Sequence, residues 1–228
     1  MPAKTTPRPG LHGSRARHAE AARAKILAAA LPHVAFDGWT PRLMREAAEA
    51  AGIGHNEMRL AFPDGPLDLV DCFLSAGDRR MEAVLAQEDL AAMKIRQRIT
   101  RAVRARLEAD APHREALRRA LTLLALPTSG ARGPRALYRT VDAIWRAAGD
   151  TSTDFNFYTK RATLAAVHSA VTLYWLADQS KDFADSWAFL DARIEDVMRF
   201  EKAKASLRGM AQKLPDPFAL LGRLRYRS

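Results

Sequence analysis

Apolar residues recur at intervals of three and four along most of this chain, and no stretch alternates with period two for long enough to form a strand. The pattern predicts an all-α protein. Turn signals divide it into helices expected over residues 17–33, 41–51, 55–61, 67–85, 90–109, 112–126, 135–148, 154–177 and 182–205. No run reaches the roughly 18 apolar residues that a transmembrane helix needs.

Composition narrows the partners to two classes without choosing between them. The 228 residues are 48% hydrophobic, which supplies one sizeable core. A net charge of +10 indicates an anionic partner, which could be nucleic acid or a membrane surface. The single cysteine, Cys72, excludes a disulfide framework and a cysteine-based zinc site.

The excess positive charge is concentrated at the two ends of the chain. Residues 1–25 hold six basic residues and one acidic residue, and residues 202–228 hold seven and one. The stretch between them is therefore close to neutral. This distribution favours attachment to a surface over a deep basic groove, although solvated tails would give the same pattern. Proline and glycine within residues 1–16 predict a disordered tail.

Residues 206–228 predict a basic amphipathic helix at the C-terminal end. Asp216 can cap this helix, and Pro217 suits its first position. The apolar members of the segment share one face, as in helices that lie at a membrane interface. The candidate membrane-binding residues are Phe218, Leu221, Arg223, Leu224, Arg225 and Arg227. A helix folded back on the core or on a partner subunit is the alternative.

Residues 17–66 predict a small domain of three helices with a glycine turn between the last two. This is the helix-turn-helix arrangement, and the stretch resembles the amino-terminal domain of the TetR family of repressors. His55 and Arg59 supply donors on the would-be recognition helix, but Glu57 repels phosphate. Asp64 stands where TetR-like repressors usually carry a lysine. A DNA-binding repressor that senses an apolar ligand is therefore the alternative function, and we expect no nucleic acid partner.

Large aromatic side chains gather near the junction of the last two expected helices. Tyr174, Trp175 and Trp187 lie close in sequence to Asp178 and Asp185. Aromatic residues ringed by acids at a turn are typical of protein contact sites. Packing in a helical core is the alternative for each of them.

Several runs of sequence resemble the Coq-nine family of ubiquinone-biosynthesis accessory proteins. They are residues 29–34 with 36–39, residues 62–65, the long run 149–161, and Asp182-Phe183 with Trp187, Phe189 and Leu190. Together these runs span about residues 25–200. The run Gly-Asp-Thr-Ser-Thr-Asp-Phe-Asn-Phe-Tyr-Thr-Lys-Arg is far more specific than a helix-turn-helix pattern.

The resemblance implies a TetR-like fold whose larger helical domain, here residues 67–205, binds isoprenoid lipid. It also implies a protein that associates with membranes and presents quinone intermediates to a Coq-seven-type di-iron hydroxylase, which acts on demethoxyubiquinone. The family's contact surface for that enzyme matches Tyr174, Trp175 and Trp187. We add Asp178 and Asp185 to this set. A homodimer is expected, because TetR-like folds usually dimerise through their last helices.

A lipid pocket also has a physical basis, because larger domains of this type leave an apolar cavity between helices. Burial of apolar groups stabilises by ~0.8 kcal/mol per methylene, so a long isoprenoid tail needs no charged anchor. Plain core is the alternative for each candidate lining residue; the candidates are Phe73, Met81, Leu137, Trp145, Leu164, Val167, Val171 and Met198.

We find no catalytic constellation. The six histidines form no Glu-x-x-His or His-x-His pair, whereas a di-iron site in a helical bundle needs repeated carboxylate–histidine pairs. Phosphate-binding glycine loops and Gly-x-Ser-x-Gly are also missing from the sequence. We therefore expect a non-enzyme without cofactor or metal. The expected location is the bacterial cytoplasm, peripheral to the inner membrane, with the mitochondrial matrix as the alternative.

Overall fold

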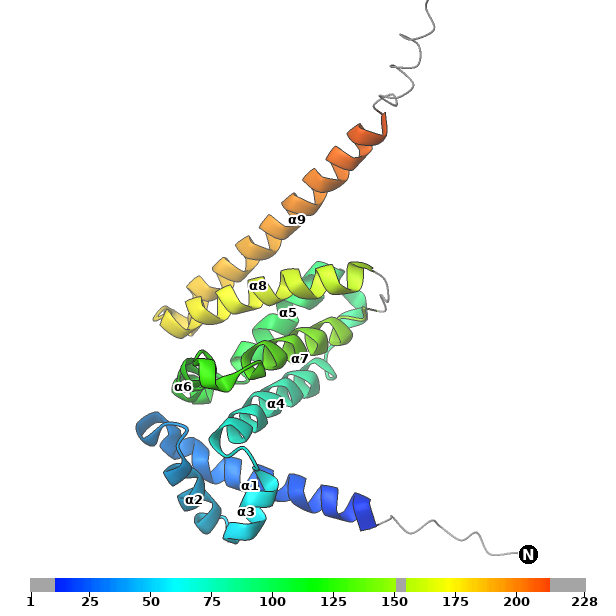
Figure 1. Cartoon of the computed structure of the whole chain (residues 1–228). Helices are drawn as coiled ribbons and strands as arrows, with labels where there is room; N and C mark the ends of the chain where they lie inside the picture. The colour runs from blue at the N-terminus through cyan, green and yellow to red at the C-terminus, as the bar shows by residue number, and fades with distance from the viewer. Residues whose placement is uncertain (1–10, 151–154, 214–228) are drawn as a thin grey trace, which may run out of the picture. The chain divides into compact units, whose positions relative to one another are not determined.

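A computed structural model describes the backbone of residues 11–150 and 155–213, and the side chains of residues 17–150 and 157–200. The described residues form helices and no strand, as predicted (Figure 1). The α-helices are α1 (Leu11–Asp37), α2 (Pro41–Ala50), α3 (His55–Ala61), α4 (Pro66–Leu85), α5 (Ile95–Glu108), α6 (Arg114–Leu124), α7 (Arg132–Ala147), α8 (Phe155–Ala177) and α9 (Ala184–Lys213). Short 3-10 turns are η1 (Leu90–Ala92), η2 (Ala111–His113), η3 (Pro127–Ser129) and η4 (Lys181–Phe183).

The chain divides into two compact units, residues 1–168 and 169–228, and the division falls inside α8. In the first unit α1 packs on α2 and α3 to form the predicted triplet. In the same unit α4 packs on α5 and α7, which gives the body of the larger domain. The second unit contains the end of α8, the turn η4 and α9.

Two side-chain contacts join the triplet to α6 within the first unit. The indole N–H of Trp39 donates to the carbonyl oxygen of Ala116 at 3.0 Å, and the Trp39 ring packs against Phe73 at 5.4 Å. The guanidinium of Arg119 donates to the carbonyl oxygen of Ala35 at 2.7 Å. The turn that contains Gly38 is therefore tied to the larger helical body. Thr40 caps α2 by accepting the N–H of Leu43.

Several helix boundaries differ from the sequence prediction. α1 begins at Leu11, inside the stretch expected to be a disordered tail. The helix expected over residues 90–109 is broken, because Asp89 caps η1 and α5 starts only at Ile95. α9 begins after a break at η4 and continues to Lys213, past the residue 206 boundary expected for the C-terminal segment.

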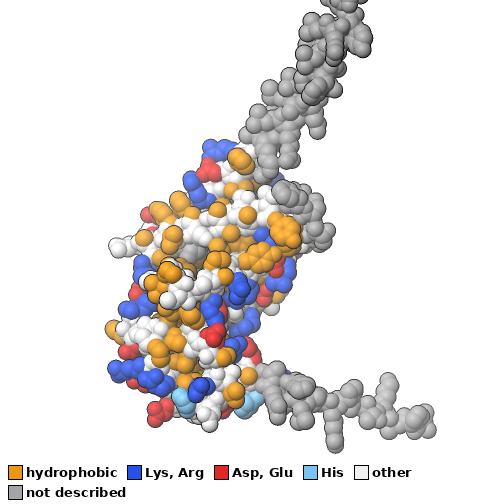
Figure 2. Space-filling view, in the orientation of Figure 1, with side chains coloured by type: hydrophobic (Ala, Val, Ile, Leu, Met, Phe, Trp, Pro, Cys, Tyr) orange, Lys and Arg blue, Asp and Glu red, His pale blue; other side chains and the backbone are white. Residues whose placement is uncertain are grey.

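On the face shown in Figure 2, side chains of Lys and Arg alternate with those of Asp and Glu, with apolar side chains between them. This mixture agrees with the near-neutral body expected from the sequence. The structure identifies no helix long and apolar enough to span a membrane among the described residues.

Candidate functional site

The junction of α8 and α9, in the second unit, brings together the aromatic residues that the sequence singled out. The ring of Tyr174 stacks on Phe189, with centroids 4.5 Å apart and planes 5° from parallel. The guanidinium of Arg193 lies over the Phe189 ring at 5.1 Å. Tyr174 remains 41% exposed, so this stack presents an aromatic surface to solvent. Phe189 and Arg193 were not among the predicted site residues.

The two tryptophans of this junction have different surroundings. Trp175 is completely buried and packs against Phe183 at 5.2 Å, so its ring is core and is not available for direct contact with a partner. Trp187 is half-buried, and its indole N–H donates to the carbonyl oxygen of Asp182 at 2.9 Å. Its edge faces Phe183 at 6.4 Å. Trp187 and Tyr174 are thus the accessible aromatic residues of the predicted set.

Asp178 is also buried, contrary to a role as a surface acid. Its carboxylate accepts the N–H of Ser180 at 2.7 Å, the N–H of Ser186 at 2.9 Å and the Ser186 hydroxyl. Burial would raise the pKa of Asp178, but these hydrogen bonds outweigh it and hold the pKa far below the usual value. The charged carboxylate therefore caps the first turn of α9. Asp185, in contrast, is exposed.

The turn between the two helices has an unusual backbone. Asp182 and Phe183 both adopt left-handed conformations, with φ of 54° and 58°. For residues other than glycine such conformations cost about 1–3 kcal/mol each and persist only where the surroundings hold them. Here the aromatic contacts of Phe183 and the hydrogen bond from Trp187 hold the turn.

The predicted lipid-lining residues are divided between the two units. In the first unit Phe73, Met81, Leu164 and Val167 are buried, whereas Leu137 and Trp145 are half-buried. In the second unit Val171 is buried and Met198 is 41% exposed. The membrane-binding candidates Phe218, Leu221, Arg223, Leu224, Arg225 and Arg227 lie outside the described residues.

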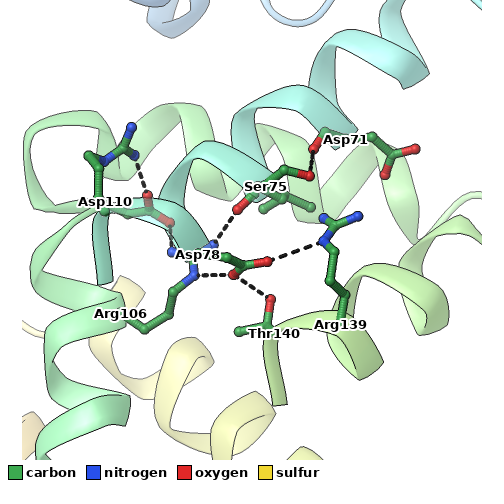
Figure 3. A network of polar contacts seen from close by, with 9 residues as sticks. Asp71, Ser75, Asp78, Arg106, Asp110, Arg139 and Thr140 are labelled. Carbon is green, nitrogen blue, oxygen red and sulfur yellow. Dashed lines mark hydrogen bonds and ion pairs between the residues drawn. The ribbon is translucent and has the colours of Figure 1, made fainter. Parts of the chain in front are cut away.

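A buried network of charges in the first unit was not predicted (Figure 3). Arg106 is 3% exposed and lies between two buried carboxylates: its Nε donates to Asp78 at 2.8 Å and its Nη1 to Asp110. Thr140 and Arg139 also donate to Asp78, at 2.8 and 3.2 Å. Burial lowers the pKa of Arg106, but the two carboxylates more than offset this and keep the guanidinium charged.

Gly77 of α4 makes room for this network. A Cβ atom at position 77 would stand 2.6 Å from Cζ and Nη1 of Arg106 and 2.7 Å from its Nη2. The guanidinium therefore lies directly on the glycine backbone. His168 is also buried. Burial, together with the positive charge of Arg106, lowers its pKa to about 4, so the imidazole is neutral at pH 7.

The carboxylates of the triplet contact basic side chains. Glu57 of α3 lies 2.9 Å from Nε2 of His18. Asp64, at the position where repressors usually carry lysine, pairs with Arg132 at the start of α7. Arg132 also pairs with Asp68 at 2.9 Å and with Asp71 at 2.6 Å. The carboxylate at position 64 therefore joins the triplet to α7.

The specific run of residues 149–161 also takes part in packing. Arg161 is 4% exposed, and its guanidinium bonds to Asp142 at 2.8 Å and to Asp150 at 3.2 Å. Lys160 pairs with Asp150 at 2.8 Å, and its carbonyl oxygen accepts the indole N–H of Trp145 at 3.2 Å. These contacts hold the start of α8 against the end of α7. Within the described part of the chain, no three His, Cys, Asp or Glu side chains are grouped to hold a metal ion.

Comparison with known proteins places these features in a family context. Residues 131–201 match the COQ9 family model. The chain is 34% identical over 197 residues to rat "Ubiquinone biosynthesis protein COQ9, mitochondrial". The aligned residues make up 83% of this chain and 63% of the rat protein. The human protein of the same name is also 34% identical, with 83% and 62% covered. The Drosophila melanogaster protein is 32% identical, with 87% and 62% covered. The chain thus spans less than two thirds of these relatives.

Among solved structures, a TetR transcriptional regulator from Nitrosomonas europaea superposes with a TM-score of 0.61 over 76% of this chain and 95% of that chain. The identity is 20%, so the likeness concerns the fold. The all-α, TetR-like fold predicted from the sequence is therefore confirmed. The predicted resemblance to the COQ9 family of ubiquinone-biosynthesis proteins is likewise confirmed, by the family model over residues 131–201 and by relatives that align with most of the chain.

Proposed function

We propose that this protein is a non-catalytic accessory protein of ubiquinone biosynthesis, which binds isoprenoid lipid and presents quinone intermediates to a Coq-seven-type di-iron hydroxylase. The observation that carries the proposal is the 34% identity, over 83% of this chain, to proteins named for ubiquinone biosynthesis. We assign the redox chemistry to the partner because this sequence lacks the repeated carboxylate–histidine pairs of a di-iron bundle.

The α8–α9 junction is the proposed contact surface for the hydroxylase. Tyr174 and Trp187 are its accessible aromatic anchors, and exposed Asp185 supplies charge beside them. Large aromatic side chains contribute most to binding at such surfaces. The buried residues Trp175 and Asp178 act behind the surface, because they pack and cap the turn that positions the anchors.

The larger helical domain is the proposed lipid site. One isoprene unit transferred from water to an apolar pocket contributes roughly 3–4 kcal/mol, from ~0.8 kcal/mol per methylene, before ordering costs. Buried Phe73, Met81 and Leu164 in the first unit are proposed lining residues there. We propose that the protein is peripheral to a membrane, in the bacterial cytoplasm or, like the relatives named mitochondrial, in the matrix. A homodimer is part of the same proposal.

Two measurements test the function. Mass spectrometry of an organic extract of gently purified protein should find an isoprenoid quinone or quinone precursor, and a lipid-free protein would count against the carrier role. In a co-purification assay, Trp187→Lys should abolish hydroxylase binding and leave the helical circular dichroism unchanged. Tyr158→Lys is the matched control, because Tyr158 is an aromatic residue that is 67% exposed in the first unit. Equal retention of the enzyme by both variants would show that the contact surface lies elsewhere.

DNA binding is the competing outcome. A repressor would shift its own promoter DNA at low salt with a steep salt dependence. Glu57 and Asp64, described above, place carboxylates on the triplet, which repel DNA phosphates, so we expect no such shift.

A further inference from the structure

One flank of α9 combines apolar side chains with carboxylates. Trp187, Asp191, Glu195 and Met198 follow one another at intervals of four, four and three residues, so they share one side of the helix. We call these four residues the Trp187 stripe. Asp191 and Glu195 are exposed, Met198 is 41% exposed and Trp187 is half-buried. The stripe is therefore open to a partner along three turns of α9.

The stack of Tyr174 on Phe189 lies on a different flank of α9. Successive residues of an α-helix are about 100° apart, so Phe189, two residues after Trp187, points about 160° away from it. The buried residues Ser186 and Leu190 lie between these two flanks. A partner that binds along the Trp187 stripe therefore need not touch the stack.

The carboxylates of the stripe are not neutralised by the rest of the second unit. The basic residues between positions 169 and 200 are Lys181, Arg193 and Arg199. Both arginines pair with Asp196, at 2.8 and 2.9 Å. Lys181 stands beside Asp182 in the turn η4. Asp191 and Glu195 take part in no ion pair that joins described residues. In a chain of net charge +10, the stripe is thus a local anionic surface.

Residues 215–228, which lie outside the described residues, have the complementary charge. They contain three arginines and one acidic residue. In the amphipathic helix predicted there, Arg223 and Arg227 stand four residues apart. Asp191 and Glu195 have the same spacing on α9, so two helices that run side by side in the same direction can form both ion pairs at once.

The same register also matches the apolar side chains. Leu220 precedes Arg223 by one helical turn, and Trp187 precedes Asp191 by one helical turn. When the arginine lies on the carboxylate, the leucine therefore lies against the indole ring. Aromatic side chains contribute most to binding at such contacts.

The geometry of α9 indicates which copy of the segment can dock. α9 continues to Lys213, about 27 Å along its axis beyond Glu195. A helix that begins at Pro217 and turns back covers only about 9 Å by Arg223 and about 15 Å by Arg227. The segment of the same copy therefore cannot bring both arginines to the two carboxylates. The segment of a second copy has no such restriction.

We propose that residues 215–228 of a second copy dock along the Trp187 stripe, with Arg223 and Arg227 on Asp191 and Glu195. This inference rests on the proposed function, because Trp187 is the proposed anchor for the hydroxylase, and it adds regulation of that site. The docked segment covers the anchor. An anionic membrane competes for the same arginines and uncovers the anchor again.

Cross-linking of the full chain tests the docking. Protein with Met198→Cys is mixed with protein with Ser228→Cys and treated with a short bismaleimide, and both variants keep the four charges of the contact. Native Cys72 does not compete, because it is buried and burial raises the pKa of its thiol. We expect a covalent dimer on a denaturing gel. Phe200→Cys is the matched control: Phe200 is 67% exposed on the opposite flank of α9, so its yield should be about tenfold lower.

Exchange of the charges gives a second readout in the same assay. Asp191→Lys with Glu195→Lys should lower the yield about tenfold, and so should Arg223→Glu with Arg227→Glu, because like charges then face each other. The combination of both reversals should restore the yield. General damage to the fold cannot produce this restoration.

Vesicles test the competition with a membrane. Phosphatidylcholine vesicles that contain phosphatidylglycerol should lower the yield about fivefold, whereas vesicles of pure phosphatidylcholine should not. Equal yields with both kinds of vesicle would overturn the proposed uncovering of the anchor.

Two results would overturn the docking itself. One is a yield at position 198 no higher than at position 200, and the other is a charge exchange that restores nothing. A cross-link confined to single copies of a Met198→Cys, Ser228→Cys double variant would overturn the assignment to a second copy. None of these results touches the lipid content or the Trp187→Lys co-purification, which test the proposed function separately.

Discussion

Replacement of Gly77 by alanine tests whether the buried charge network is as tightly packed as its geometry indicates. In a helix interior this change ordinarily stabilises by about 1 kcal/mol. Here the new methyl group would stand 2.6 Å from the Arg106 guanidinium. The guanidinium cannot move aside freely, because Asp78, Asp110 and the carbonyl oxygen of Leu74 all hold it.

The magnitude follows from those bonds. Displacement of the guanidinium loses at least one charge-assisted hydrogen bond, worth about 1.5–3 kcal/mol, and overpacking adds about 1–3 kcal/mol. After the gain in helix propensity, Gly77→Ala should lower the free energy of unfolding by about 1.5–5 kcal/mol. For a chain of this size each kcal/mol shifts Tm by about 2–4 °C. Urea and thermal unfolding followed by circular dichroism measure both quantities.

Two further variants make the test specific. Gly133→Ala is the matched control in α7, because its Cβ would meet Leu124 only at ordinary contact distances of 3.5 and 3.6 Å. It should be neutral or slightly stabilising. Arg106→Met should itself cost about 3–5 kcal/mol by leaving buried carboxylates without their partner, and in that background Gly77→Ala should lose its penalty. A Gly77→Ala protein as stable as the wild type would refute the reasoning.

Three other predictions concern separate parts of the chain. The pKa of His168 is about 4 in the folded protein and near the ordinary 6.5 in the unfolded chain, so between these values the unfolded state binds one more proton. The free energy of unfolding should therefore fall as the pH drops from 7 toward 4. At 1.36 kcal/mol per pKa unit the loss is about 3 kcal/mol. Burial and Arg80 also lower the pKa of His113, which therefore contributes to stability in the same direction. The effect of His168 is isolated by urea titrations of the wild type and of His168→Asn at each pH, as the difference between their free energies of unfolding. If the free energies of the two proteins fell in parallel with pH, the prediction would be contradicted. Arg132→Ala should destabilise by about 2 kcal/mol, because Asp64, Asp68 and Asp71 lose their shared cation; the midpoint of urea unfolding checks this, with exposed Arg45→Ala as the control that should change nothing. Deletion of residues 215–228 should reduce flotation with anionic vesicles, because it removes three arginines and the apolar face of the predicted helix, and unchanged flotation would reject that segment as a membrane contact.

Local signals in the sequence were enough to predict most of the helices. Thr40 and Pro41 mark the start of α2, and the seven-residue helix α3 was expected at its observed bounds. The break before α5 was missed, because residues 90–109 keep a helical apolar period although Asp89 caps a short turn there. The left-handed backbone at Asp182 and Phe183 was also missed, since Asp adopts this conformation only occasionally and Phe rarely does.

The sequence by itself determined the all-helical fold, the resemblance to the COQ9 family and the aromatic character of the α8–α9 junction, because these depend on periodicity and on motifs that are contiguous in the chain. Tertiary structure decided which aromatic residue is accessible: Trp175 and Trp187 look alike in sequence, but only Trp175 is enclosed on all sides. It also decided that Arg106, on a helix rich in arginine, is buried. Its partner Asp78 comes from another helix, 28 residues away, and only folding brings the two charges into one desolvated site where each requires the other.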